Sequence, residues 1–230
     1  MKELGDALRS ILDKLSQFLD LFDLSFLLSG AATGSAICYL AHRSGIPFPI
    51  PSAGWQQVAA VVVFSYVSGL ASFALGRWPR TVGKRREKSF DALFLVVLGA
   101  HGLSDVPSFK AYLDQVAVRG SWRLYVRLWA EIRVLTSAAP TLALLNRYWV
   151  MAAMYDGLFV AAILWIGAIA SGTFWLRHDF DYVTGTGVCV ALLLVAWGSY
   201  REAGRYFHYQ IEELVAAVAT ARQKHSLLAL

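Results

Sequence analysis

Residues 149–176 read WVMAAMYDGLFVAAILWIGAIASGTFWL and carry a single formal charge, at Asp156. An α-helix rises about 1.5 Å per residue, so roughly 20 apolar residues cross the hydrocarbon core of a bilayer. This stretch is therefore long enough to span a membrane. A second apolar stretch without any charge, residues 182–200, follows after the short connector RHDFD. So short a connector predicts a tight helical hairpin of two membrane spans.

The composition of the whole chain agrees with this interpretation. Hydrophobic residues make up 57% of the 230 residues and charged residues 16%, whereas soluble domains are about a quarter charged. The mean hydropathy is +0.50. We therefore expect one polytopic membrane domain rather than a large water-soluble core. The two cysteines, Cys38 and Cys189, both lie within apolar stretches and predict no disulfide framework.

Two further apolar runs precede the hairpin. Residues 24–41 contain Gly30 and Gly34, a GxxxG pair whose missing side chains let two helices approach closely in lipid. A specific helix contact and ordinary bundle packing remain alternative interpretations of this pair. Residues 55–76 form the second run, with tryptophans near both of its ends, as is typical of membrane boundaries. The chain is thus predicted to cross the membrane four times.

Polar residues inside these spans form the first candidate site. An acid within a span costs a few kcal/mol and usually faces a partner, a cavity or an ion path. Asp156 can therefore line a cation-attracting pore mouth, or it can pair with Arg147 or Arg201 at the membrane surface. Serine hydroxyls can extend the same polar seam, or they can simply bond back to their own helix. The predicted pore or seam residues are Asp156, Ser65, Ser68 and Ser72.

Basic residues predict the orientation of the chain. The run RWPRTVGKRREK directly follows the second span, where it is more typical of a stop-transfer segment touching anionic lipid than of a nucleic-acid patch. With the N-terminus in the cytoplasm, 19 of the 21 lysines and arginines lie on inner segments, and only Arg43 and Arg177 lie outside. Because basic loops stay in the cytoplasm, both termini are predicted to be cytoplasmic.

The predicted fold is all-α, a polytopic membrane protein with four transmembrane helices and a small helical cytoplasmic head. The third span can begin near Pro140, and the fourth can continue to about Arg222, so both helices exceed the bilayer and project into the cytoplasm. Residues 1–23 have helical apolar spacing and are expected to lie on the membrane, to pair with another helix or to plug a pore. The predicted segments are an amphipathic helix (1–23), a first transmembrane pair (24–76), a basic cytoplasmic helical segment (77–147), the transmembrane hairpin (148–200) and a cytoplasmic C-terminal helix (201–230).

The second candidate site lies in the predicted head. The helix SWRLYVRLWAEIRVL and the residues before it place arginines at i, i+4 and i+8 with aromatic residues between them, and the last helix repeats part of this spacing. Arginines can fork onto phosphates, and aromatic rings can stack on bases. Alternatively, the arginines pair with Glu131, Glu202 or lipid phosphates while the tryptophans fill the core. The candidate ligand-binding residues are Arg119, Arg123, Arg127, Trp122, Arg201 and Arg205.

Catalytic patterns are missing from the sequence. The five histidines fall in separate segments, and no spacing typical of metal ligands, phosphate-binding loops or nucleophile elbows occurs. His101, Ser104 and Asp105 have the residue types of a catalytic triad, but three neighbours on one loop rarely reach triad geometry. We therefore expect no enzyme, no cofactor and no metal site.

The layout resembles that of small bacterial membrane effectors of antiphage defence, such as the Hailong-type channel effectors. The segments that carry the likeness are FDLSFLLSG (22–30), SYVSGLASF (65–73), the basic-aromatic stretch and the long final hairpin. In this chain Ser29-Gly30 stands where family proteins begin the first span with Pro-Gly. The resemblance implies a homo-oligomeric channel in the bacterial inner membrane. It also implies a nucleotide or oligonucleotide trigger, made by a partner enzyme, that opens the channel.

Two other function classes remain open from the sequence. A non-conducting scaffold or accessory subunit that recruits a cytoplasmic partner predicts a dry bundle interior with Asp156 in a salt bridge. A small transporter predicts a helix that is broken at mid-membrane, for which the glycine pairs Gly30/Gly34 and Gly185/Gly187 are the only signal.

Overall fold

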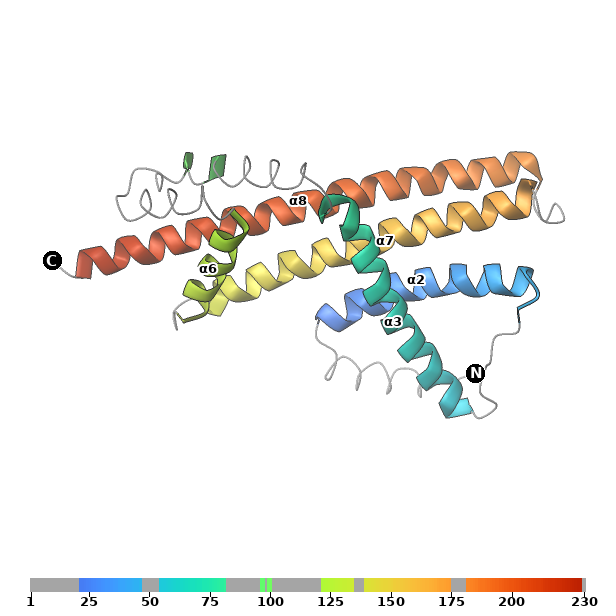
Figure 1. Ribbon diagram of the computed structural model, residues 1–230, viewed down its shortest axis with the longest axis horizontal. Coiled ribbons are helices and arrows are strands. Elements are labelled where there is room, and N and C mark those ends of the chain that lie inside the picture. Colours follow the sequence, from blue (N-terminus) through green and yellow to red (C-terminus); the bar gives the residue numbers. More distant parts are fainter. Residues whose placement is uncertain are drawn as a thin grey trace, which may run out of the picture. The chain divides into compact units, whose positions relative to one another are not determined.

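The computed structural model describes residues 21–46, 54–81, 96–97, 99–100, 121–134, 139–174 and 181–228. These residues form an all-α fold, which confirms the predicted class. The helices follow one another as α2 (Leu21–Arg43), α3 (Gly54–Thr81), α6 (Ser121–Val134), α7 (Ala139–Phe174) and α8 (Tyr182–Leu228) (Figure 1). The predicted amphipathic helix over residues 1–23 lies outside the described part, except for its last three residues, which begin α2.

Four of these helices are long and apolar enough to cross a membrane, in agreement with the sequence. The apolar segments are Leu24–Arg43 in α2, Gly54–Pro79 in α3, Pro140–Thr173 in α7 and Tyr182–Ala221 in α8. The two long helices are as continuous as predicted, because neither contains an internal breaker. α7 begins one residue before Pro140, where proline is tolerated because the first turn needs no N–H donor.

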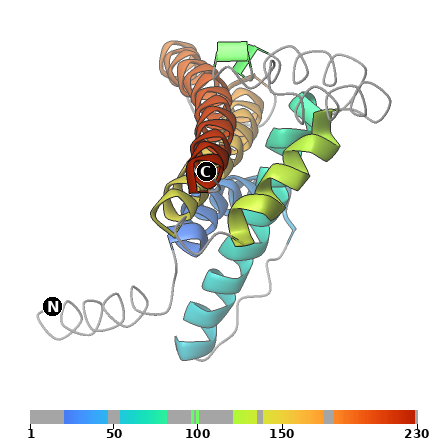
Figure 2. The ribbon, with the colours of Figure 1, turned by 90° about the vertical axis from the view of Figure 1, so that its left-hand side faces the viewer.

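The two long helices pack against each other in antiparallel fashion. Figures 1 and 2 show α7 and α8 running side by side. Along the contact, residue numbers fall in α7 while they rise in α8. From the hairpin connector outward, the facing pairs are Thr173 with Gly185, Ile166 with Cys189, Phe159 with Tyr200, and Leu145 with Gln210.

Helix α2 ends in a glycine motif. Gly45 has a φ of 71°, a left-handed conformation that glycine adopts without steric cost. The N–H of Ile46 donates to the carbonyl of Ala41 (2.9 Å) and the N–H of Gly45 to that of His42 (3.2 Å). These bonds satisfy carbonyls that the helix end leaves open, as in a Schellman motif. His42 and Arg43 lie beyond residues 24–41, the apolar run predicted to form the first span, yet both belong to α2.

Helix α3 is longer than predicted. The second span was expected to end at Gly76, but the helix continues through Arg77, Trp78 and Pro79 to Thr81. Pro79 has no N–H to donate to the carbonyl of Leu75, four residues earlier. Because this loss occurs in the last turns of α3, it costs one bond near the end and does not break the helix.

Asp181 caps the N-terminus of α8. Its Oδ1 accepts a hydrogen bond from the backbone N–H of Thr184 (2.6 Å), and its Oδ2 accepts one from the Thr184 hydroxyl (2.9 Å). The side chain thereby satisfies one of the orphan N–H groups of the first turn. These bonds, first of all that from the Thr184 N–H, lower the pKa of the Asp181 carboxyl below its ordinary value of 3.8.

Removing this cap should loosen the first turn of α8 in a pH-dependent way. A lowered pKa means that the ionised carboxylate stabilises the folded turn above the ordinary pKa, and that this stabilisation is lost as the pH falls below it. We expect severalfold faster amide exchange of residues 183–185 in Asp181→Ala at pH 7. In Asp181→Asn, which keeps the acceptor but not the charge, the difference from the native chain should vanish below about pH 4. Exchange rates corrected for intrinsic chemistry that show no such convergence would contradict this role of the charge.

The chain divides into two compact units. The first comprises Met1–Arg77 and Ala153–Ala203, and the second comprises Trp78–Ala152 and Gly204–Leu230. Both long helices contribute to each unit. The location of the second unit in the cytoplasm stays a prediction.

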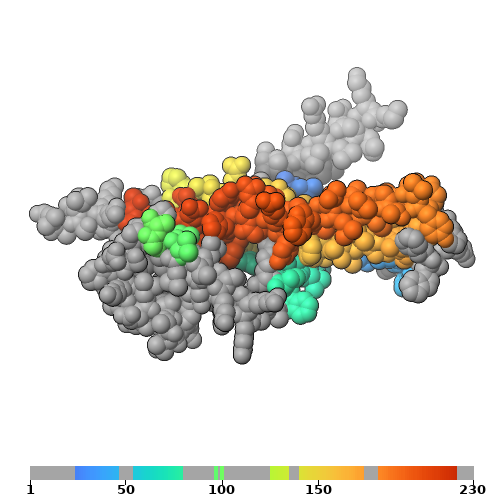
Figure 3. Space-filling model, turned by 90° about the horizontal axis from the view of Figure 1, so that it is seen from above, coloured from blue at the N-terminus to red at the C-terminus, as the bar shows by residue number. Residues whose placement is uncertain are grey.

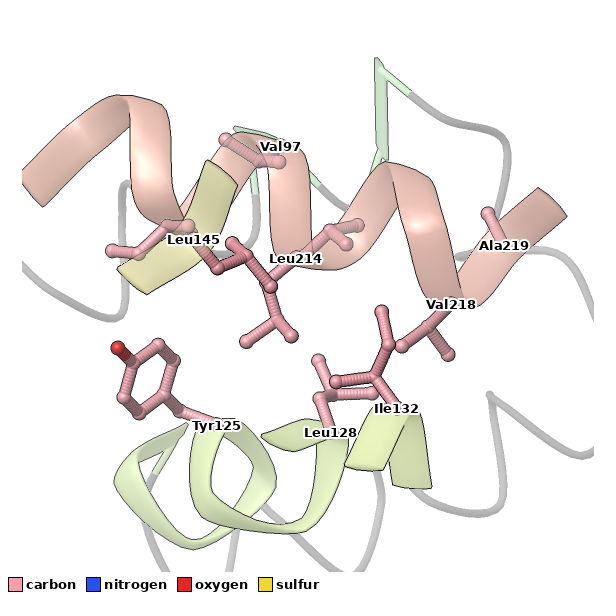
Figure 4. Close-up of a cluster of buried hydrophobic side chains, with 10 residues drawn as sticks. Val97, Tyr125, Leu128, Ile132, Leu145, Leu214, Val218 and Ala219 are labelled. Carbon is pink, nitrogen blue, oxygen red and sulfur yellow. The ribbon is translucent and has the colours of Figure 1, made fainter. Parts of the chain in front are cut away.

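The described core of the second unit lies where α6 meets α7 and α8. Tyr125, Leu128 and Ile132 lie on one side of α6, at spacings of three and four residues, and are buried. Figure 4 shows these side chains pointing toward α8, with Leu145 of α7 beside them. The buried cluster consists of Val97, Tyr125, Leu128, Ile132, Leu145, Ile211, Leu214, Val215, Val218 and Ala219.

A buried polar group lies within this apolar core. Gln210 is fully buried; it accepts a hydrogen bond from the Tyr125 hydroxyl (3.3 Å) and donates one to the backbone carbonyl of Leu145 (3.5 Å). A buried amide without partners would cost free energy. The two bonds therefore favour one register among α6, α7 and α8.

Candidate functional site

Buried polar side chains gather on α2, α3 and α7 in the first unit. The structure buries the four predicted seam residues, and Ser72 and Asp156 are only 1% and 3% exposed. Helix α2 adds three buried polar residues that were not predicted as part of the seam. They recur every four residues, a helical spacing that could have revealed them. Together the polar seam consists of Ser25, Ser29, Thr33, Ser65, Ser68, Ser72 and Asp156.

Glycines bring the backbones of α2 and α3 together beside this seam. A Cβ on Gly30 would collide with the backbone carbonyl of Ser65, and one on Gly69 would collide with that of Phe26. A Cβ on Gly34 would lie 2.8 Å from the Phe64 ring. Both members of the GxxxG pair thus face α3, and Gly30 lies at the closest approach of the two helices.

A second close contact joins α3 and α7. A Cβ on Gly76 would collide with the backbone carbonyl of Asp156. A Cβ on the next residue, Gly157, would lie 2.6 Å from the Ser29 hydroxyl and 3.2 Å from that of Ser72. Three helices therefore meet around Gly157, and Asp156 lies next to this meeting point.

The hydroxyls at the meeting point bond to their own helices. Ser29 donates to the carbonyl of Ser25 (3.0 Å), and Ser72 donates to that of Gly69 (3.0 Å). A hydroxyl that bonds to the preceding turn can sit in an apolar environment without a water molecule. These two bonds agree with the alternative that serine hydroxyls in the spans bond back to their own helix.

The neighbours of Asp156 indicate its depth. Gly76, which contacts it, is followed by Arg77, and Tyr200, which packs on Phe159 one turn further along α7, is followed by Arg201. From Asp156 to Phe174 the chain advances 18 residues, or about 27 Å, which nearly matches a hydrocarbon core of about 30 Å. In a bilayer whose core begins at the level of Gly76 and Tyr200 and ends near Phe174, Asp156 lies near one edge of the core.

An indole hydrogen bond also ties α7 to α2. The Nε1–H of Trp165 donates to the backbone carbonyl of Ala32 (3.0 Å), and the Trp165 ring packs on Tyr39 at 5.7 Å between centroids. This contact was not foreseen, because the partner of a tryptophan in an apolar span cannot be inferred from its spacing.

The predicted ligand-binding residues are only partly described. Arg119 lies outside the described residues, and for Trp122 and Arg123 only the helical backbone of α6 is described. The remaining three arginines are exposed: Arg127 on α6, and Arg201 and Arg205 on α8. Arg127 and Arg205 belong to the second unit and Arg201 to the first.

The aromatic residues between the arginines of α6 are not all available to a ligand. Tyr125 is buried and Trp129 packs against the core cluster, where the Arg133 guanidinium lies 5.4 Å from the Trp129 ring. On α8, by contrast, Arg205 lies beside an exposed ring: its Nη2 donates to the Tyr209 hydroxyl (3.1 Å). The guanidinium lies 5.9 Å from the centre of that ring.

Among the residues that the structure describes, no group of three or more His, Cys, Asp or Glu side chains is arranged to hold a metal ion. Comparisons with protein-family models, with curated proteins and with solved structures find no match for this chain.

Proposed function

We propose that this protein is an oligomeric, pore-forming membrane effector whose opening is controlled by a nucleotide or oligonucleotide bound to its second unit. The observation that carries the proposal is Asp156, an acid only 3% exposed beside the junction of three apolar helices. Acids at such positions usually serve an ion path or a specific partner. At the edge of the bilayer core, the carboxylate would attract cations to a pore mouth.

The outer surfaces of the spans support assembly with further copies. Only 22% of the residues in the apolar window of α3 and 17% of those in α8 are buried within one chain, against 39% in α2 and 44% in α7. Figure 3 shows α8 uncovered along much of one face. Lipid can cover such faces, and further copies of the chain can share them, which a pore needs.

The resemblance to Hailong-type effectors supplies the proposed setting. In it, a partner enzyme makes the signal, the pore opens in the inner membrane of an infected bacterium, and loss of the membrane potential halts the cell. The distribution of basic residues supports an orientation with both termini in the cytoplasm. The second unit would then face the compartment in which a nucleotide signal is produced.

One observation favours a second candidate, a non-conducting scaffold that recruits a cytoplasmic partner. The hydroxyls of Ser29 and Ser72 donate hydrogen bonds to backbone carbonyls of their own helices, so the seam does not need water molecules to satisfy them. A transporter receives less support, because α8 runs unbroken through Gly185 and Gly187. The described parts of the other three spans are also continuous helices.

Ion flux through liposomes containing the full-length protein tests the pore. We expect cation flux on addition of the activating nucleotide and at least about fivefold less flux in Asp156→Asn. A carboxylate about 4 Å from a cation contributes about 1 kcal/mol even in water, and more where the site is less hydrated. Asp181→Asn removes the same charge from the exposed end of α8 and is the matched control, with unchanged flux. Absence of flux under every condition would reject the pore in favour of the scaffold. Equal flux in both variants would assign Asp156 to packing.

A further inference from the structure

Three tyrosine rings from α7 and α8 form a cluster in the second unit that the polar seam and the arginine row do not include. The ring centre of Tyr148 lies 6.3 Å from that of Tyr206 and 6.0 Å from that of Tyr209, and the latter two lie 6.3 Å apart. Tyr206 and Tyr209 share one face of α8 because they are three residues apart. We call these three residues the tyrosine cluster.

The cluster is open to solvent on one side and carries a cation there. Tyr209 is 38% exposed, and Tyr148 and Tyr206 are half-buried. The exposed Arg205 lies beside the Tyr209 ring, 5.9 Å from its centre, and donates to its hydroxyl. The imidazole of His208 lies 6.5 Å from the same ring, centre to centre. A flat aromatic surface thus adjoins a guanidinium.

Lipid headgroups are a poor match for this position. Tyr209 lies nine residues beyond Tyr200 along the continuous helix α8, which corresponds to about 13 Å. The headgroup layer outside the hydrocarbon core is only about 5–8 Å thick on each side. In a bilayer whose core ends near Tyr200, the cluster therefore lies in water beyond the headgroups, and its expected ligand is a soluble one.

We propose that the tyrosine cluster is a nucleotide-binding site, in which a base stacks on the exposed side of Tyr209 and Arg205 holds a phosphate. The rings contact one another and leave no slot between them, so the base binds on the outside of the cluster. Stacking on an aromatic ring accepts any base, and a guanidinium matches the geometry of a phosphate. This inference rests on the proposed function and names the site of its trigger.

Binding of radiolabelled ATP and of a radiolabelled adenylate trinucleotide to full-length protein in nanodiscs tests the site. We expect Tyr209→Ala to weaken binding about tenfold or more and Tyr209→Phe to weaken it much less, because the ring provides the stacking. Tyr182→Ala removes a more exposed tyrosine from the other end of α8 and is the control, with unchanged affinity. Arg205→Gln should weaken binding, whereas Glu213→Gln, which removes a negative charge one turn beyond Tyr209, should strengthen it.

The other outcomes are distinct. Binding that pyrophosphate displaces as well as ATP does, or that needs anionic lipid in the nanodisc, would overturn base stacking in favour of a phosphate-only or headgroup contact. No binding of either probe, or equal binding by Tyr209→Ala, would overturn the site. Nucleotide binding without flux would reject the pore and keep the nucleotide-binding site. Nucleotide-triggered flux that is unchanged in Tyr209→Ala would keep the pore and reject the site.

Discussion

Replacing Gly30 with alanine is expected to destabilise the first unit by about 1–3 kcal/mol, the usual cost of inserting a methyl group into a packed contact. The added Cβ would meet the backbone carbonyl of Ser65 and the backbone nitrogen of Gly69. Backbone atoms cannot swing aside as a long side chain does, so α2 and α3 must move apart. That separation would also loosen the seam beside them.

A second glycine provides a control with the opposite sign. Gly198 lies inside α8, and among the described residues no atom outside its own stretch of helix lies within 4 Å of the position of its missing Cβ. Gly198→Ala should therefore stabilise the chain by up to about 1 kcal/mol, because alanine loses less conformational freedom in a helix. The free energy of unfolding, measured by SDS titration in mixed micelles, compares the two variants. Equal effects would contradict the close contact at Gly30.

Truncating Leu128 should have the largest effect in the second unit. Its side chain is 1% exposed within the buried cluster, and Leu→Ala at such a site costs about 2–5 kcal/mol. Helix α6 has only 14 residues and is too short to be stable alone in water. We therefore expect α6 to detach from α7 and α8 and to exchange its amide protons much faster.

The control for this variant lies two residues away on the same helix. Val126 is 51% exposed, so Val126→Ala should change the free energy of unfolding by no more than about 0.5 kcal/mol. Hydrogen exchange and limited proteolysis of the full-length protein distinguish the two variants. If Leu128→Ala left the exchange of α6 as slow as in the native chain, the docking of α6 through this cluster would be wrong.

The helices were predictable where length and hydropathy determine them. The unbroken helices from Pro140 and from Tyr182 followed from apolar runs without a breaker, and α6 begins at Ser121, as predicted for the helix SWRLYVRLWAEIRVL. The extension of α3 past Gly76 was missed. The apolar run ends at Gly76, but the basic residues and the proline that follow do not end the helix, because a proline in the last turns leaves most of the helical bonds intact.

The candidate sites were less predictable, because facing partners depend on tertiary packing. Spacing placed Ser65, Ser68 and Ser72 on one side of a helix but could not show that Ser29 and Gly157 would meet them. Similarly, Tyr125 alternates with arginines in the sequence, and its spacing could not show that the ring is buried and bonded to Gln210. The tyrosine cluster needed the pairing of α7 with α8, which brings Tyr148 opposite residues about sixty positions later.

The hydrogen bonds of Ser29 and Ser72 to their own helices bear on biogenesis. Each of these hydroxyls is satisfied before any neighbouring span arrives, so α2 and α3 can leave the translocon one at a time without exposing an unbonded proton to lipid. The helices can then pack together in a separate, later stage, in which glycines such as Gly30 and Gly69 let the backbones of α2 and α3 approach each other closely. Synthesis of the chain as two separate halves should accordingly still permit their reunion in the bilayer.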